Sequence, residues 1–184
     1  MTRLAVATGN PHKLAELGAS LPGIELVAIA TDASPPLEDG RTYAANARLK
    51  ARFGREHAPP DAWAVGEDSG IEAAALGGAP GIHSARWADD GVARLLTELA
   101  EAADRSLRYV CVIVAISPEG EELVASGTLD GAAALERRGI GGFGYDPIFV
   151  PLGETRTVAE LGDAWKHGHS HRARAARALA DRLP

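Results

Sequence analysis

A short apolar stretch that runs into two adjacent carboxylates constrains this chain more than any other feature. Residues 63–66 are apolar or small, as in a buried strand, and Glu67, Asp68, Ser69 and Gly70 follow directly. Adjacent carboxylates repel each other, and burying them without a partner is costly. A hard cation such as Mg²⁺ would remove that cost, because it prefers carboxylate oxygens. The alternative is a solvated acidic turn in which Ser69 caps a helix.

Length and composition bound the class of protein. The 184 residues suffice for one large domain or for two lobes around one sheet, and we treat 1–184 as a single domain. No apolar run approaches the roughly 20 residues of a membrane span, and the apolar start at residues 4–7 is too short for a signal peptide. The net charge of −6 argues against general nucleic-acid binding. The single cysteine, Cys111, cannot form an intrachain disulfide, which fits a reducing cytoplasm.

The lysines are a second unusual feature. Of 19 basic residues only Lys13, Lys50 and Lys166 are lysine, so 19 minus 3 leaves 16 arginines. A lysine ammonium is a compact point charge that the planar arginine fork does not imitate. Lys13 follows a strand-to-helix turn at residues 9–11, where free N–H groups and the helix dipole suit a phosphate. An ordinary capped helix is the alternative for this turn.

Local patterns predict alternating strands and helices. The expected strands cover residues 3–8, 23–30, 63–66, 108–116 and 123–129, with a turn at 117–120 joining the last two. The expected helices start at Asn10, run from Thr42 to about residue 55, cover 88–103 and 157–161, and end the chain after a Ser170 cap.

A glycine-rich loop surrounds Phe143. Four glycines lie within residues 139–144, and such a loop brings backbone close to something flat or anionic. Phe143 could then stack on a nucleobase. A glycine-rich hairpin with a core phenylalanine is the alternative.

The last helix breaks a local rule. His171 and Arg172 place positive donors at its N-terminus, where the helix dipole disfavours cations, so a bound acceptor or anion would explain them. A zinc site formed by His167, His169 and His171 is an alternative, but the spacing lacks the separated ligand pairs of zinc sites.

In order and spacing, these motifs resemble the inosine triphosphate pyrophosphatase family. The matching stretches cover nearly the whole chain: Thr8–Lys13, Asn46–Ala51, Glu67–Gly70, Leu76–Gly81, Ser84–Arg86, Gly142–Phe149, Lys166 and Ser170–Arg172. The chain departs from the family pattern at Glu67, where aspartate is more usual, and at His83 and Trp87. The segment after Arg86 is also shorter than in the family pattern.

The resemblance implies an α/β fold: a mixed, curved central sheet with flanking helices, and two lobes around an active-site cleft. It also implies a homodimer and Mg²⁺-dependent hydrolysis of inosine and xanthosine triphosphates, ribo or deoxy, to monophosphate and pyrophosphate. Glu38, Glu67 and Asp68 would hold the metal, and Asp68 would be the catalytic proton acceptor. The implied substrate-binding residues are Thr8, Gly9, Asn10, Pro11, His12, Lys13, Lys50, Ser69, Phe143, Gly144, Tyr145, Asp146, Lys166, His171 and Arg172.

Base selectivity follows from donor chemistry. Inosine and xanthosine carry an acceptor oxygen at purine position six, where adenine carries a donor amine. Arg172 has only donors and His171 can present one, so both would pair with a keto purine. The alternatives are a pyrophosphatase of similar fold acting on modified pyrimidine nucleotides, and a nucleotide-binding protein without activity. The acidic residues of the site argue against the second alternative.

Overall fold

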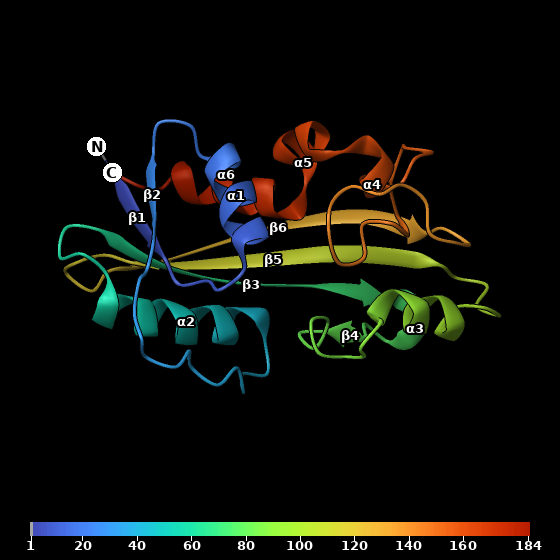
Figure 1. Ribbon diagram of the computed structural model, residues 1–184, viewed down its shortest axis with the longest axis horizontal. Coiled ribbons are helices and arrows are strands. Elements are labelled where there is room, and N and C mark those ends of the chain that lie inside the picture. The colour runs from blue at the N-terminus through green and yellow to red at the C-terminus, as the bar shows by residue number, and fades with distance from the viewer. Residues whose placement is uncertain (1) are drawn as a thin grey trace. The chain divides into compact units, whose positions relative to one another are not determined.

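The computed structural model describes residues 2–184 and shows an α/β protein built on one mixed sheet (Figure 1). The strand order is β2-β1-β3-β5-β6-β7, and β4 pairs with β3 outside this path. The pairs β1–β2 and β1–β3 are parallel, whereas β3–β4 and β6–β7 are antiparallel. The strands are β1 (Arg3–Val6), β2 (Glu25–Ala28), β3 (Trp63–Ala73), β4 (Pro80–Gly81), β5 (Ser106–Ile116), β6 (Glu122–Ala133) and β7 (Phe149–Pro151).

Six α-helices and one short 3₁₀-helix accompany the sheet in the described part of the chain. They are α1 (Pro11–Ser20), α2 (Tyr43–His57), η1 (Ala74–Leu76), α3 (Gly91–Glu98), α4 (Val158–Leu161), α5 (Asp163–His169) and α6 (His171–Ala180). Within residues 2–184, none of the helices has the length and apolar character needed to cross a membrane.

The chain divides into two compact units. The first unit contains the chain up to Asp68, together with Cys111–Gly127 and Arg172–Pro184. The second unit contains Ser69–Val110 and Thr128–His171. The strands β3, β5 and β6 contribute residues to both units.

In the first unit, helices cover both faces of the sheet (Figure 1). Ile113 of β5 packs in a cluster with Leu17 of α1 and Leu179 of α6. The next residue, Val114, belongs to a separate cluster with Ala47 of α2. Successive strand residues therefore face different helices, as the two-residue period of a strand requires.

The strand β3 is longer than the sequence predicts. It continues through Glu67 and Asp68 to Ala73, so the expectation that the strand ends at the carboxylates is wrong. Gly66 allows α2 to lie against the strand, because a Cβ there would lie 2.1 Å from the carbonyl oxygen of Ala47. The extension pairs through its backbone with β4, where Ile71 and Glu72 face Gly81 and Pro80. The strand can carry both buried carboxylates because lysines of the first unit pair them.

The second unit has its own apolar core around α3 and the start of β5. Leu95 of α3, Tyr109 and Phe149 belong to one buried cluster. The helix α3 covers Gly91–Glu98 and is shorter than the predicted 88–103. It starts late because the side chain of Asp90 caps it by accepting from the N–H of Ala93. The predicted caps Asn10 and Thr42 are confirmed. Thr157, the first residue of the predicted turn 157–161, caps α4.

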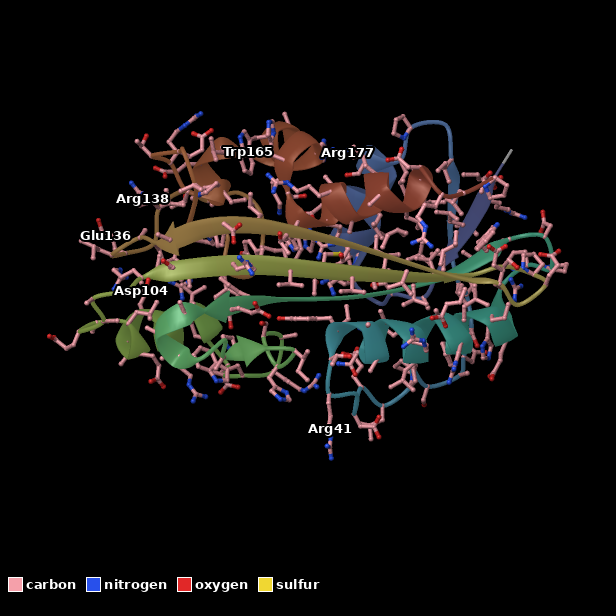
Figure 2. All side chains as sticks on the ribbon, turned by 180° about the vertical axis from the view of Figure 1, so that it is seen from behind. Arg41, Asp104, Glu136, Arg138, Trp165 and Arg177 are labelled. Carbon is pink, nitrogen blue, oxygen red and sulfur yellow. The ribbon has the colours of Figure 1, made fainter. Side chains whose placement is uncertain are left out.

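The helix α5 is not among the predicted elements. It carries Trp165, labelled in Figure 2, whose ring stacks on His169 at a centroid distance of 4.8 Å. The next helix, α6, begins at His171, directly after the predicted cap Ser170. The structure therefore places two short helices where the sequence predicts a loop and one helix.

Candidate active site

The strand β3 directs its two adjacent carboxylates to different lysines of the first unit. Glu67 and Asp68 are 3% and 4% exposed. The ammonium of Lys13 on α1 lies 2.7 Å from Glu67 Oε2, and that of Lys50 on α2 lies 3.2 Å from Asp68 Oδ1. Since neighbouring strand side chains point to opposite faces, each carboxylate has its own cation and their mutual repulsion is relieved.

Lys50 also joins the acidic loop that precedes α2. Its ammonium lies 2.8 Å from Glu38 Oε1 and 3.0 Å from the carbonyl oxygen of Glu67. Burial alone would lower the pKa of Lys50, but the hydrogen bond to Glu38 and the charge of Asp68 outweigh burial and raise it. Burial raises the pKa of Asp68, against the opposing charge of Lys50. A carboxylate with a raised pKa is a better proton acceptor.

Asn46 ties the acidic loop to Asp68. This side chain is fully buried, donates to Asp68 Oδ2 over 3.2 Å and accepts from the N–H of Gly40 over 2.9 Å. Asn46 lies in a stretch that matches the family pattern but is not among the predicted site residues. Its spacing of four residues from Lys50, which puts both on one helix face, was the signal for including it.

Arg172 completes what we call the carboxylate cluster of the first unit. Its guanidinium is 2% exposed, donates to Glu16 on α1, and lies 3.2 Å from Glu67 Oε1. Burial would lower the pKa of Arg172, but the negative charges of Glu67 and Glu16 raise it. The cluster contains Glu16, Glu38, Glu67 and Asp68 with Lys13, Lys50 and Arg172, so four carboxylates face three cations.

Cys111 lies beside this cluster. The thiol is fully buried, and its sulfur is 3.4 Å from Glu67 Oε1. Burial raises the pKa of Cys111 well above its ordinary value, so the thiol stays protonated as a weak donor to the carboxylate. Cys111 is not among the site residues predicted from the sequence, where it indicates only the redox environment.

A second polar group, the Asp146 cluster, lies in the second unit and consists of Tyr109, Phe143, Asp146 and Lys166. The ammonium of Lys166 lies 2.7 Å from Asp146 Oδ2, which also accepts from the N–H of Phe143 over 2.9 Å. The hydroxyl of Tyr109 donates to Asp146 Oδ1 over 3.1 Å. Lys166 also lies 4.6 Å from the centroid of the Phe143 ring. The structure thus brings together three residues that the sequence predicted for the substrate site, and adds Tyr109.

Residues 4–182 match the Ham1 family. The chain belongs to the Ham1 family. The dITP/XTP pyrophosphatase of Symbiobacterium thermophilum is 45% identical over 190 residues, which cover 99% of this chain and 95% of that protein. The dITP/XTP pyrophosphatase of Bdellovibrio bacteriovorus is 41% identical over 98% of this chain and 96% of that protein. The structure of the Staphylococcus aureus Ham1 protein superposes with a TM-score of 0.86 at 33% identity, covering 99% and 98% of the two chains.

Membership of the Ham1 family confirms the family resemblance and the α/β fold with a mixed sheet that the sequence analysis derived from it. The roles assigned to single residues stay predictions. This applies first to Arg172, because both terminal nitrogens of its guanidinium donate to carboxylates of the first unit.

The turn before α1 has the predicted cap in this Ham1-family chain. The side chain of Asn10 accepts from the N–H groups of His12 and Lys13 over 3.0 and 3.4 Å. Thr8 Oγ1 accepts from the N–H of Asn10 over 3.1 Å. These amides therefore already have an acceptor within the turn, and a phosphate role for residues 8–12 stays a prediction.

The remaining predicted substrate residues lie in or beside the second unit's core. Tyr145 is 7% exposed and donates its hydroxyl to the carbonyl oxygen of Ser84 over 3.1 Å. Burial raises the pKa of Tyr145. Gly144 has a positive φ of 60°, and Ser69 lies within β3. His171 stacks on Tyr109 with a centroid distance of 4.5 Å.

The carboxylates suit a divalent cation by their chemistry. Mg²⁺ takes oxygen ligands and is usually bound through one or two carboxylates together with substrate phosphates. Across residues 2–184, no group of three or more His, Cys, Asp or Glu side chains has the geometry to hold a metal ion. In the structure the ammonium of Lys50 lies within 3.2 Å of both Glu38 and Asp68, two of the three predicted ligands. The metal role of Glu38, Glu67 and Asp68 stays a prediction.

Proposed function

We propose that this Ham1-family protein is a hydrolase that converts inosine and xanthosine triphosphates, ribo or deoxy, to the monophosphate and pyrophosphate. One observation carries the proposal: relatives named dITP/XTP pyrophosphatase are 41% and 45% identical to this chain over 98% and 99% of its length. The activity would remove such nucleotides from the nucleotide pool.

The carboxylate cluster supplies groups for the chemical step. Water attacks the α-phosphorus, the bond from that phosphorus to the oxygen bridging to the β-phosphorus breaks, and the leaving pyrophosphate takes up negative charge. Asp68 accepts the proton of the attacking water, which its raised pKa favours. Lys13 and Lys50 are placed to offset charge on phosphate oxygens.

A magnesium ion held by Glu38 and Asp68, which share the ammonium of Lys50, would polarise the water and stabilise charge on the phosphate oxygens. Glu67, the third predicted ligand, points to the opposite face of β3, toward Lys13, and would not bind the same ion directly. The shared contact of Glu38 and Asp68 with Lys50 supports this assignment, because it places oxygens of two carboxylates within 3.2 Å of one point.

The Asp146 cluster and the start of α6 are proposed to bind the base. Phe143 would stack on the ring, which adds affinity for any base. Donors from His171 and Arg172 would pair with the oxygen at purine position six. A site built on such hydrogen bonds can reject a mismatched base by roughly 10⁴-fold. The expected order is inosine and xanthosine triphosphates first, guanosine triphosphate next, and adenosine triphosphate last.

We also propose that the single domain 1–184 forms a homodimer and acts in the cytoplasm. Three large apolar side chains of the second unit, Leu135, Ile140 and Leu152, are 84%, 106% and 84% exposed in the isolated chain. Burial of such side chains favours association. Light scattering on the purified protein should give twice the mass of 19.1 kDa, and a monomeric mass would contradict the dimer.

The decisive experiment measures pyrophosphate release from a nucleotide panel with and without Mg²⁺. We expect hydrolysis of inosine, deoxyinosine and xanthosine triphosphates that chelation abolishes and Mg²⁺ restores. Hydrolysis confined to modified pyrimidine nucleotides would favour the alternative substrate class. Binding without pyrophosphate release from any nucleotide would show that the protein is not this hydrolase.

A further inference from the structure

Tyr109 contacts two residues that are proposed to bind the base. It lies in β5 and is 7% exposed. Its hydroxyl donates to Asp146 Oδ1 over 3.1 Å. Its ring stacks on His171 with a centroid distance of 4.5 Å and an interplanar angle of 10°, and on Phe149 with values of 4.4 Å and 24°. One buried side chain therefore reaches a carboxylate and an imidazole that come from different elements.

The two oxygens of Asp146 have different donors. Lys166 and the N–H of Phe143 both bind Oδ2, whereas the hydroxyl of Tyr109 binds Oδ1. The contacts at Oδ2 hold one end of the carboxylate, and the bond at Oδ1 sets its rotation. The backbone of Gly142 lies close to the same carboxylate, because a Cβ at this glycine would lie 2.2 Å from Oδ2. The orientation of Asp146 thus depends on the Tyr109 hydroxyl.

The stacking contact acts on His171. An imidazole that lies nearly parallel to a buried phenol ring has its ring plane set by that contact. Tyr109 is itself held by Phe149, which is fully buried. Tyr109 therefore links the His171 ring to the Asp146 carboxylate through one side chain of the core.

We infer that Tyr109 is a positioning residue for the nucleobase, which fixes the Asp146 carboxylate and the His171 ring in one arrangement. The inference rests on the proposed function, because it assigns Tyr109 to the base-binding part of that site. A residue with this role affects binding of the nucleoside part of the substrate and leaves binding of the phosphate part unchanged.

The test is Tyr109→Phe in the full chain, with inosine monophosphate and pyrophosphate as separate calorimetric probes. Loss of one hydrogen bond to a buried carboxylate should weaken inosine monophosphate binding roughly tenfold. Pyrophosphate affinity should not change. In turnover assays with inosine triphosphate, KM should rise about as much as the monophosphate Kd, while kcat stays the same. Tyr109→Leu also removes the stacking and should weaken monophosphate binding by a further ~2- to 10-fold.

Thr157→Val is the matched control. Its hydroxyl is fully buried in the same unit and donates to the carbonyl oxygen of Arg138 over 2.8 Å, with no contact to Asp146. This variant should lower Tm but leave the affinity for both probes unchanged. The inference would be overturned if Tyr109→Phe bound inosine monophosphate as tightly as the wild type, or if it lost affinity equally for both probes. Hydrolysis of inosine triphosphate by the wild-type enzyme would still support the proposed function in that case. A wild-type protein that neither hydrolyses inosine triphosphate nor binds the monophosphate would overturn both.

Discussion

The two buried polar clusters hold charge in different ways. In the carboxylate cluster, four carboxylates are matched by three cations, and both members of the Glu67–Asp68 pair use lysines as partners. In the Asp146 cluster, one carboxylate meets one ammonium, and two neutral donors complete its coordination. In the first arrangement Glu38 and Asp68 share one ammonium, and such a pair of carboxylates suits a divalent cation. The second is neutral and suits an uncharged ring.

The clusters also differ in the elements that carry them. The charged residues of the first cluster lie on β3, α1, α2 and α6, except for Glu38 in a loop. Phe143 and Asp146 of the second cluster lie in a segment without a helix or strand, in which Gly142 and Gly144 have positive φ. Chemistry that needs exact placement is better served by regular elements, whereas a flat base tolerates a loop.

The largest contrast is expected from neutralising one carboxylate in each cluster. Asp68→Asn keeps the shape of the side chain but removes a base and a metal charge, so kcat should fall by roughly 10²–10⁴-fold. Asp146→Asn should mainly raise KM. Steady-state kinetics with inosine triphosphate, together with circular dichroism to verify folding, measure both. Near-normal kcat in a folded Asp68→Asn protein would refute the role of that residue.

Removing one cation from each cluster should separate their contributions to stability. Arg172→Met leaves Glu16 and Glu67 without a guanidinium in a buried site, and should lower the free energy of unfolding by ~3–5 kcal/mol. Lys166→Met leaves Asp146 with two neutral donors, and should cost about 1–3 kcal/mol. Urea unfolding followed by fluorescence gives both values. A larger loss for the Lys166 variant would contradict the proposed difference between the clusters.

The contact of α2 with β3 can be perturbed without touching any charge. Gly66→Ala forces a Cβ against backbone atoms of Ala47 and Ala51, at 2.1 and 2.4 Å, and should destabilise the protein by about 1–3 kcal/mol. Gly18→Ala is the control, because nothing lies within 4 Å of its Cβ position in α1. Alanine there should stabilise the helix by up to ~1 kcal/mol. If thermal unfolding shifted Tm in the same direction for both variants, a steric clash at Gly66 would not be the cause of the change in stability.

The smallest effects are expected from exchanging lysine for arginine. Lys13→Arg and Lys166→Arg keep the charge but replace a point donor by a planar fork, so kcat/KM should drop roughly tenfold in each. Arg94→Lys, at a surface position over the Trp87 ring, serves as the control with unchanged kcat/KM. If all three variants had the same kcat/KM, the scarcity of lysine in this chain would have no relation to the site.

Local features of the fold could be predicted from the sequence, because their cause lies within a few residues. The caps at Asn10, Thr42 and Thr157 each bond to an N–H two or three residues away. The length of β3 could not be predicted in this way, since the groups that pair its carboxylates come from α1 and α2. The pattern of Glu67-Asp68 alone therefore favoured a strand end.

The same distinction applies to the site. Phe143 and Asp146 are three residues apart and meet as their motif indicated. Arg172 and Glu16 are 156 residues apart, and no local pattern links them. The roles of the metal ligands, the phosphate-binding turn and the cleft implied by the family resemblance stay predictions.

The single cysteine gives access to the motions of the carboxylate cluster. Cys111 is fully buried against Glu67, so a thiol reagent in solution reacts only when this part of the first unit opens. With reagent in excess, the labelling rate reports how often that opening occurs, on timescales that a static structure does not reveal. Ligands that bridge the cluster should slow the labelling in proportion to their affinity. Cys111 is therefore a natural probe of local opening that contacts Glu67 of the proposed site, and no engineered label is needed.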